Sequence, residues 1–439
     1  METKLDFTIP TLGKATIRSP VKEAMYHSDD ERILYDITLK NYHGHAASGE
    51  EPLSFEVAGA REFTYFDPSK TRSAIVTCGG LCPGINDVIR ALVMVLHYRY
   101  GAHNICGIRY GYQGFIPKYG HEPMILTPDV VSEIHTLGGS ILASSRGDQE
   151  IGEIVDSLER MNISIFFALG GDGTMNGAEA IFQEVQRRGL KIAVVGIPKT
   201  IDNDLLFIEK SFGFETAFSE ACESIQCAHT EAIGAPNGIG LVKLMGRHSG
   251  YITANAALAT GDANIVLIPE VPFELDGPKG LLAHLKERLA RRGHAVMLVA
   301  EGAGQDLIER YTQQHESECD ASGNIRLQDV GLFLKEQINA YFNKIGTEVN
   351  LKYIDPSYII RSVPANPSDS IYCTQLAHNA VHAAMAGKTG LAVGRWHNIF
   401  THVPIKMVVL KRNTLSPKSQ LWLDVLENTG QPDAFINDA

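Results

Sequence analysis

Residues 163–178 read ISIFFALGGDGTMNGA, and this stretch decides the fold. β-Branched and aromatic residues, the pattern of a buried strand, lead into glycines around an aspartate and then into a predicted helix over 175–188. Strand, glycine-rich turn and helix together form the repeating unit of a parallel α/β sheet. Such a turn can bring backbone N–H groups to a phosphate, with Asp172 placed to hold Mg²⁺. The alternative is a tight turn in which Asp172 or Thr174 caps the helix.

The same alternation of apolar strand-like runs and helix-like stretches extends along most of the chain from residue 73 onward. Further strand-like runs lie at 73–78, 104–108, 191–197, 238–244, 264–269 and 295–301. Helices are predicted over 85–99, 128–137, 150–160, 212–229, 248–260, 277–292, 328–344 and 370–386. Nearly continuous apolar strands separated by helices indicate a doubly wound α/β fold with mainly parallel sheets. Residues 1–70 are mixed and polar, and we expect an N-terminal extension with a few strands or helical turns.

Composition excludes several classes of function. The net charge of −12 over 439 residues argues against nucleic acid and anionic membranes as partners. No apolar run approaches the ~20 residues that a membrane-spanning helix needs, and the N-terminus lacks a signal-peptide core. The seven cysteines are scattered without a CxxC pair, which predicts a reduced, cytoplasmic protein without structural zinc.

Glycine and charge gather where the predicted strands end, the edge at which such folds bind ligands. TCGGLCPGIND (77–87) matches neither GxxxxGK[ST] nor GxGxxG. A phosphate contact at Gly80 and a plain turn with Pro83 at a helix start are equally supported. PKTIDNDL (198–205) brings Lys199 close to two carboxylates, Asp202 and Asp204. A carboxylate can take the proton of an attacking hydroxyl and a lysine can neutralise phosphate charge, whereas the alternative is a solvated turn.

Three later segments carry candidate substrate contacts. KLMGRHSGYI (243–252) places Arg247 in a glycine-flanked turn, where it could bind phosphate or form a surface ion pair. Glu301 ends a strand in EGAGQ (301–305) and could accept hydrogen bonds from sugar hydroxyls. In KYIDPSYIIRS (352–362), Lys352 and Tyr358 share a face of an extended chain, but Arg361 does not unless a turn at Asp355–Pro356 intervenes. A structural tyrosine and a surface arginine remain the alternative.

Taken in order, TCGGLCPGIND, GGDGT, PKTIDND, MGRHSGY, EG and KYIDPSYIIR resemble the phosphofructokinase family over about residues 70–400. DDERILYD and FDPSKTRSAIVTCGGLCPG look like the long ATP-dependent enzymes of plants and trypanosomatids. The resemblance implies phosphorylation of fructose 6-phosphate at its 1-hydroxyl by ATP with Mg²⁺, in a homodimer or homotetramer. It also implies two Rossmann-like lobes with an active-site cleft between them. The nucleotide lobe would span 71–212 plus about 365–439, and the sugar-phosphate lobe 213–364.

The resemblance also implies roles for individual residues. The donor would contact Gly80, Arg146, Gly147, Gly171, Asp172, Gly173 and Thr174, and Asp172 would hold the metal. Asp202 would be the general base, with Lys199 and Thr200 beside the transferred phosphoryl group. The sugar phosphate would contact Thr200, Ile201, Asp202, Met245, Gly246, Arg247, Glu301, Lys352, Tyr358 and Arg361, where Lys352 stands in for an arginine that reaches from a neighbouring subunit.

Some positions depart from the short bacterial relatives, so their allosteric behaviour does not carry over. Tyr358 replaces a histidine, Gly238 an arginine and Lys199 a glycine. Pyrophosphate-dependent members typically have aspartate at position 173 and lysine at 199. Gly173 adds neither bulk nor negative charge where a nucleotide would pass. We therefore give Gly173 more weight than Lys199 and predict ATP as the donor. A pyrophosphate-dependent enzyme and a non-catalytic regulatory subunit are the alternatives, and GGDGT alone would also fit a lipid or NAD kinase.

Overall fold

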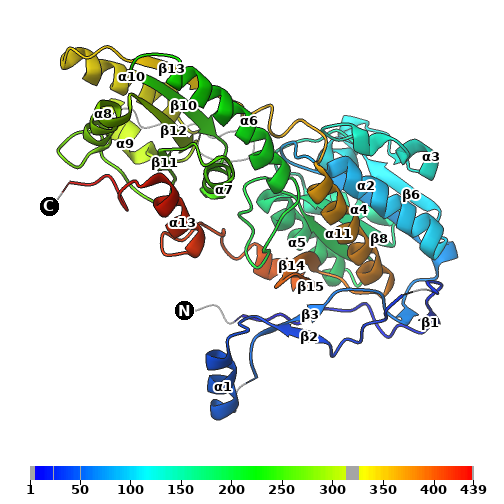
Figure 1. Ribbon diagram of the computed structural model, residues 1–439. Helices are drawn as coiled ribbons and strands as arrows, with labels where there is room; N and C mark the ends of the chain where they lie inside the picture. Colours follow the sequence, from blue (N-terminus) through cyan, green and yellow to red (C-terminus); the bar gives the residue numbers. More distant parts are fainter. Residues whose placement is uncertain (1–4, 23, 50, 313–325, 438–439) are drawn as a thin grey trace. The chain divides into compact units, whose positions relative to one another are not determined.

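The structure, a computed structural model, describes residues 5–22, 24–49, 51–312 and 326–437, and it divides into two compact units (Figure 1). Unit 1 comprises Met1–Thr200, Leu205–Gly213 and Ser362–Arg412. Unit 2 comprises Ile201–Asp204, Phe214–Arg361 and Asn413–Ala439. Within the described residues no helix is long and apolar enough to cross a membrane.

Unit 1 is built on one nine-stranded sheet. Its five central strands run parallel and confirm the predicted α/β class, while the outer pairs on both sides are antiparallel. The strands in spatial order are β2 (Arg32–Leu34), β3 (Ser54–Val57), β15 (Ile399–Pro404), β14 (Leu391–Trp396), β9 (Ala193–Pro198), β8 (Ile165–Gly170), β5 (Arg72–Thr77), β6 (Asn104–Ile108) and β7 (Met124–Ile125). The N-terminal extension therefore contributes two strands to the main sheet. It also forms a small ribbon from β1 (Ile17–Arg18) and β4 (Phe63–Thr64).

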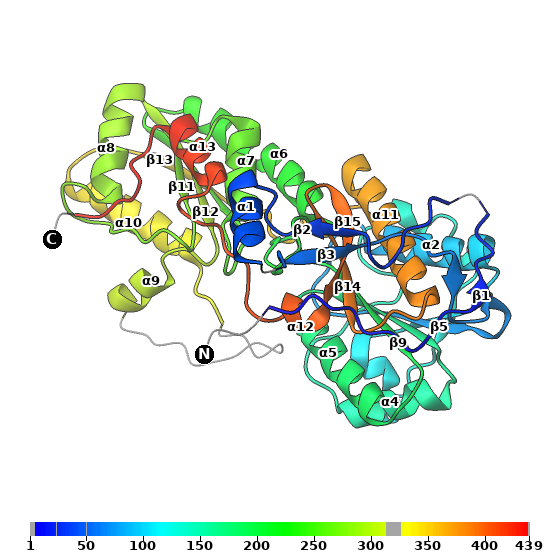
Figure 2. The ribbon, with the colours of Figure 1, turned by 90° about the horizontal axis from the view of Figure 1, so that it is seen from below.

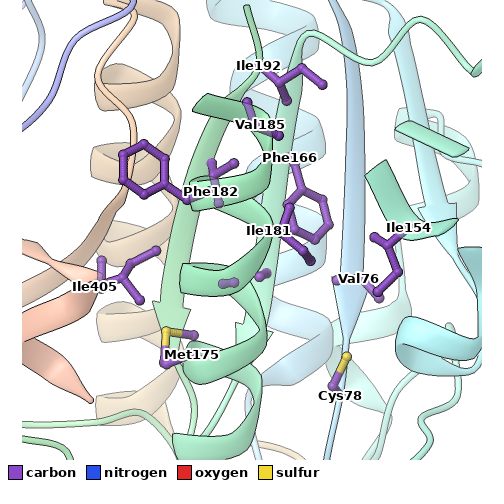
Figure 3. Packing of buried hydrophobic residues seen from close by; sticks show 14 of the residues in the cluster. Val76, Cys78, Ile154, Phe166, Met175, Ile181, Phe182, Val185, Ile192 and Ile405 are labelled. Carbon is purple, nitrogen blue, oxygen red and sulfur yellow. The ribbon is translucent and has the colours of Figure 1, made fainter. Parts of the chain in front are cut away.

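Helices cover both faces of this sheet, as Figure 2 shows. One face carries α2 (Ile85–Met94), which continues as the π-helical turn η2 (Val95–Tyr100), together with α11 (Pro367–Met385). The other face carries α4 (Ile151–Arg160) and α5 (Asp172–Arg187). Figure 3 shows α5 directing Ile181, Phe182 and Val185 toward the strands, where Phe166 lies beneath them. Burying each such side chain stabilises the unit by about 1.5–3 kcal/mol.

Unit 2 contains a parallel four-stranded sheet. Its strands in spatial order are β11 (Ile265–Leu267), β12 (His294–Ala300), β10 (Gly238–Leu244) and β13 (Asn350–Ile354). Helices α6 (Phe214–Ile233) and α7 (Tyr251–Thr260) cover one face, and α8 (Leu281–Arg292) and α10 (Val330–Lys344) cover the other. Successive side chains of β10 point to opposite faces of the sheet. Ile239 and Leu241 join the apolar core with α8 and α10, whereas Gly240 faces Ala228 of α6.

The remaining elements are short and lie mostly between the main ones. They are α1 (Leu39–Ser48), η1 (Pro68–Lys70), η3 (Gly111–Phe115), η4 (Pro117–Tyr119), α3 (Pro128–Val131), η5 (Ile134–Thr136), α9 (Gln305–Thr312), α12 (Ile405–Val408) and α13 (Gln420–Thr429). The helix predicted over 128–137 is thus two short turns rather than one helix, because the chain leaves helical geometry at Glu133.

Two further predictions need correction. The helix after GGDGT begins at Asp172 rather than Met175, since the Met175 N–H already bonds to the Gly171 carbonyl at 2.9 Å. Residues 413–439 were predicted to lie with the nucleotide lobe, but they belong to unit 2. Phe435 enters the core of unit 2 and the Gln431 side chain bonds to both backbone groups of Val266, which holds this segment there.

Candidate active site

Three loops of unit 1 follow the adjacent parallel strands β5, β8 and β9, so their starts lie at one edge of the sheet. The first loop contains Gly79, whose φ of 85° favours glycine, and the predicted donor contact Gly80. The Gly79 N–H donates to the Ser145 carbonyl at 3.1 Å, and the Ser144 hydroxyl donates to the Gly79 carbonyl at 2.7 Å. These bonds bring the segment with Arg146 and Gly147 beside the Gly80 loop.

The second loop turns directly into α5. Gly171 is the N-cap, and the first N–H groups of the helix come from Asp172, Gly173 and Thr174. Helix N-terminal N–H groups carry partial positive charge and attract phosphate. The buried Thr174 is fixed from below, because the Tyr112 hydroxyl donates to its carbonyl at 2.8 Å. No pattern in the sequence indicates that Tyr112 supports this loop.

Gly173 stands at an open position of this loop. A β-carbon built on Gly173 meets nothing within 4 Å, and the backbone of Gly173 is outside the left-handed region. A side chain could therefore be accommodated without strain at this residue. Glycine therefore adds neither bulk nor charge at the start of α5.

The third loop brings Lys199 against the first two. Its N–H donates to the Gly170 carbonyl at 2.9 Å, and its ammonium donates to the Gly80 carbonyl at 2.6 Å. The side chain is only 5% exposed. The loops that follow β5, β8 and β9 thus meet at Lys199, and a buried ammonium here offers positive charge to an anionic ligand. The next residue, Thr200, accepts a hydrogen bond from the Ser211 hydroxyl at 2.6 Å through its carbonyl.

The Asp172 carboxylate lies beside a cation that the sequence did not reveal. Its Oδ2 is 3.3 Å from Nη2 of Arg412, and its Oδ1 accepts a hydrogen bond from Asn176 at 3.3 Å. The side chains of Asp172 and Arg412 are each about one-third exposed. No three His, Cys, Asp or Glu side chains within the described residues gather as a metal site. A single accessible carboxylate nevertheless fits Mg²⁺, which takes most of its oxygen ligands from water and substrate phosphate.

In unit 2, the loops after β10 and β12 lie side by side. The Glu301 N–H donates to the Leu244 carbonyl at 2.9 Å, and the Gly302 N–H donates to the Gly246 carbonyl at 3.2 Å. A β-carbon on Gly302 would collide with the Arg247 carbonyl, so glycine is required there. Burial raises the pKa of Glu301, while the charges of Lys243 and Arg247 oppose that rise. The structure therefore brings together the predicted residues Met245, Gly246, Arg247 and Glu301.

Asp202 belongs to the same edge of unit 2. Its carbonyl accepts a hydrogen bond from the Ser249 hydroxyl at 2.9 Å, which ties it to the loop after β10. The Asp204 carbonyl accepts from the Asn413 N–H at 2.8 Å, and the intervening Asn203 has a φ of 53°. Residues 201–204, which include the predicted contact Ile201, are therefore held at both ends.

The segment after β13 contains the turn on which the pairing of Tyr358 and Arg361 depends. The N–H groups of Ile359 and Ile360 both bond to the Pro356 carbonyl, at 2.8 and 3.1 Å. The turn brings the Arg361 guanidinium carbon to 4.8 Å from the centre of the Tyr358 ring. Unlike this pair, Lys352 lies within β13, where it is exposed and in register with Gly240. That places it about 16 Å along the sheet from the level of Met245, apart from the other predicted residues.

Two ion pairs of Lys243 lie next to this turn, and the sequence did not predict them. The Lys243 ammonium lies 2.9 Å from both Asp329 and Asp355, and these two carboxylates raise its pKa despite the opposing effect of its burial. Asp355 opens the turn, so Lys243 fixes where the turn begins. No local sequence pattern links these three residues.

Comparison with known proteins gives a consistent answer. Residues 72–384 match the family described as Phosphofructokinase. A protein of Borreliella burgdorferi named ATP-dependent 6-phosphofructokinase is 48% identical over 99% of this chain and 98% of its own. A protein of Amycolatopsis methanolica with the same name is 47% identical over 98% of this chain and 96% of its own. One of Arabidopsis thaliana, described as chloroplastic, is 47% identical over 93% of this chain and 76% of its own.

Solved structures support the fold. A pyrophosphate-dependent phosphofructokinase of Marinobacter aquaeolei superposes with a TM-score of 0.66 at 19% identity, covering 82% of this chain and 91% of the other. The phosphofructokinase of Pichia pastoris superposes with a TM-score of 0.62 at 21% identity, covering 82% of this chain and 37% of the other. From the match over residues 72–384 and the relatives that span nearly its whole length, the chain belongs to the phosphofructokinase family.

Proposed function

We propose that this chain transfers the γ-phosphoryl group of ATP to the 1-hydroxyl of fructose 6-phosphate, giving fructose 1,6-bisphosphate and ADP. The observation that carries the proposal is 47–48% identity over at least 98% of the chain to two proteins named ATP-dependent 6-phosphofructokinase. The geometry of the strand ends supports it, because each unit offers one set of residues suited to one of the two substrates.

Unit 1 takes the phosphoryl donor in this proposal. The N–H groups that open α5 and the buried Lys199 ammonium supply positive charge to the β- and γ-phosphates. Gly80, Arg146 and Gly147 complete the donor contacts, since their segments are hydrogen-bonded to each other. Asp172 would hold Mg²⁺, which when bound neutralises charge on the donor phosphates.

Unit 2 takes the sugar phosphate. Arg247 and Arg361 bind the 6-phosphate, since guanidinium groups match phosphate oxygens in pairs. Tyr358 is stacked with Arg361 and limits its freedom before substrate arrives. Glu301 accepts hydrogen bonds from sugar hydroxyls, while Met245 and Gly246 shape the loop beside it.

The transfer itself is in line. The Asp202 carboxylate takes the proton of the 1-hydroxyl as the oxygen of that group forms its bond to the γ-phosphorus. The bond from the γ-phosphorus to the bridging oxygen breaks, and the electron pair leaves with ADP. Lys199 and Thr200, close to Asp202 in the chain, stabilise charge on the transferring group. A positioned base of this kind contributes about 10²- to 10⁴-fold in rate.

Donor choice rests on the open position at Gly173. An aspartate there would place negative charge beside the phosphate chain of a nucleotide, and Gly173 supplies none. Lys199 favours pyrophosphate by analogy with family members that use it, but a cation assists either donor, whereas an anion excludes one. ATP is therefore the proposed donor.

The proposal includes a homo-oligomer in the cytoplasm. Lys352 is exposed on β13, which is an edge strand of its sheet, and this suits a residue that reaches a neighbouring subunit. The six cysteines among the described residues carry free thiols, which suits a reducing compartment.

Product identification tests the reaction directly. Purified protein would be incubated with fructose 6-phosphate, ATP and Mg²⁺ and followed by ³¹P NMR. We expect a new phosphomonoester signal of fructose 1,6-bisphosphate to grow in step with ADP. ADP formed together with inorganic phosphate, or a bisphosphate other than the 1,6-isomer, would contradict the proposal.

A further inference from the structure

The carboxyl group of Glu270, in the turn after β11 of unit 2, binds two segments that are far apart in the sequence. Its Oε1 accepts hydrogen bonds from the Gly250 N–H at 3.1 Å and from the Leu415 N–H at 2.7 Å. Gly250 is the N-cap of α7, and Leu415 is a buried residue of the C-terminal segment. One oxygen atom thus ties the loop before α7 to the C-terminal segment.

The first of these segments supports the proposed base. Ser249 directly precedes Gly250 and is 1% exposed, and its hydroxyl donates to the Asp202 carbonyl at 2.9 Å. A β-carbon on Gly250 would lie 2.4 Å from the Ile268 side chain and 3.2 Å from Oε2 of Glu270, so glycine lets the carboxyl group approach. The hydrogen bond to the Gly250 N–H therefore fixes where the Ser249 hydroxyl meets Asp202.

The second segment supports the other end of residues 201–204. The Asn413 N–H donates to the Asp204 carbonyl at 2.8 Å. The N–H of Leu415, two residues later, is the one that donates to Glu270. All of these residues belong to unit 2. Glu270 therefore reaches both supports of residues 201–204 through one hydrogen bond each.

The Glu270 carboxyl group is packed against protein. Its Oε2 is buried and accepts no hydrogen bond from the part of the chain that the structure describes. Burial raises the pKa of Glu270, and the N–H groups of Leu415 and Gly250 oppose that rise. Removing the carboxyl group would take the acceptor away from the N–H groups of two buried residues, which favours a shift of both segments.

The sugar-phosphate contacts have a separate support. The Gly302 N–H, in the loop after β12, donates to the Gly246 carbonyl at 3.2 Å, and the Arg247 carbonyl lies against Gly302. Neither contact involves Glu270. A change at Glu270 should therefore displace Asp202 more than Arg247.

We propose that Glu270 is a positioning residue for the general base, which holds Asp202 where its carboxylate can take the proton of the 1-hydroxyl. It acts through Ser249 and the C-terminal segment rather than through contact with substrate. The inference rests on the proposed role of Asp202. Because a misplacement of about 1 Å can cost about 10²-fold in rate, loss of the Glu270 carboxyl group lowers kcat and leaves sugar-phosphate binding nearly unchanged.

The test is steady-state kinetics of the full chain with ATP, Mg²⁺ and varied fructose 6-phosphate, below the melting temperature of each variant. Glu270→Met removes the acceptor and should lower kcat about 10- to 100-fold, with the KM for fructose 6-phosphate within about threefold. Glu270→Gln keeps one oxygen for the two N–H groups and should retain kcat within about threefold. A purely structural role would lower the melting temperature without this split between kcat and KM.

Glu274→Met is the matched control. Glu274 also lies in unit 2, and its carboxylate accepts the N–H of Asn437 in the C-terminal segment at 3.0 Å. The further hydrogen bonds of Asn437 lead to Asp276 and Lys279 and not to residues 201–204. The control therefore removes a similar contact and should keep the parental kcat.

A double-mutant cycle tests the route through Ser249. Ser249→Ala should lower kcat with the same small effect on KM. Combined with Glu270→Met, it should cost less than the product of the two single effects, because both changes loosen the same support of Asp202. Independent, multiplicative losses would contradict this route.

The proposal is overturned if folded Glu270→Met keeps kcat within about threefold of the parent, or if Glu270→Gln or Glu274→Met loses as much as Glu270→Met. Should Glu270→Met fail to fold, Glu270→Asp, which withdraws the carboxylate by one methylene, takes its place with the same expected split. Asp202→Asn is measured alongside. An active parent with an inactive Asp202→Asn confirms the base, so an unchanged Glu270 variant then refutes this inference alone. A parent chain without turnover would refute the proposed function and this inference with it.

Discussion

Gly173→Asp should weaken the use of ATP by this enzyme without unfolding it. Gly173 is exposed, a β-carbon there meets nothing within 4 Å, and its backbone is one that any residue adopts. It occupies the second position of α5, where a carboxylate favours the helix by about 0.3–1 kcal/mol. The variant should therefore melt at the same temperature as the parent chain or slightly above it.

The effect on ATP follows from the added charge. A carboxylate about 5 Å from a donor phosphate, at an effective dielectric constant near 20, opposes it by about 3 kcal/mol. Exposure to water reduces this, and we expect about 2–3 kcal/mol, or roughly a 30- to 150-fold lower kcat/KM for ATP. The same charge opposes pyrophosphate less, because pyrophosphate has no third phosphate group to pass this position.

The assay is kcat/KM for ATP at saturating fructose 6-phosphate, with Gly173→Ala as the matched control. Alanine adds the β-carbon without the charge and should stay within about threefold of the parent. If Gly173→Asp is folded and keeps its parental kcat/KM for ATP, the reasoning from charge is refuted. If alanine causes the same loss as aspartate, the requirement is for glycine itself and not for an absent charge.

Three further predictions concern the base, the metal and the N-terminal extension. Asp202→Asn should lower kcat by about 10²- to 10⁴-fold and leave the KM for fructose 6-phosphate within about threefold, and near-parental turnover would exclude Asp202 as the base. Arg412→Gln should lower the half-saturating free Mg²⁺ concentration about two- to fivefold in rate titrations, since Arg412 lies 3.3 Å from Asp172, the proposed metal ligand, and an unchanged or higher value would contradict this. Burial raises the pKa of Glu56, but the hydrogen bonds and charges of His402 and Lys388 lower this pKa to about 2. Because this pKa is depressed in the folded chain, the stability that Glu56 contributes is present above pH 4.5 and disappears toward pH 2. The gap in unfolding free energy between the parent and Glu56→Gln, measured by urea titration, should therefore narrow over that range, and a constant gap would contradict the linkage.

The sequence predicted the central architecture well where a segment carries a strong local pattern. Strands β5, β8, β9, β10 and β12 are continuous apolar runs, and each is buried in the middle of a sheet. The hairpin of β14 and β15 was missed, because LAVGRW and IFTHVP mix glycine, arginine and histidine with apolar residues. Glycine-rich GGDGT is typical of a turn, so the sequence predicts a helix start after it, although a helix can start within it once Gly171 supplies the cap.

Contacts between distant segments could not be predicted from the sequence. Arg412 and Asp172 are 240 residues apart, and nothing around Arg412 distinguishes it from other surface arginines. The same holds for Lys243 with Asp329 and Asp355, which meet because α10, capped by Asp329, and β13, followed by Asp355, both lie against β10. The pairing of Tyr358 with Arg361 was conditional on a turn at Pro356, and hydrogen bonds to the Pro356 carbonyl form that turn.

The central claim is that the chain phosphorylates fructose 6-phosphate from ATP. The most direct measurement is the initial rate with fructose 6-phosphate and Mg²⁺, with ATP or pyrophosphate as the donor in otherwise identical assays. The account predicts turnover with ATP and none above background with pyrophosphate. Turnover with pyrophosphate alone would show that Lys199 outweighs Gly173, and no turnover with either donor would contradict the catalytic account.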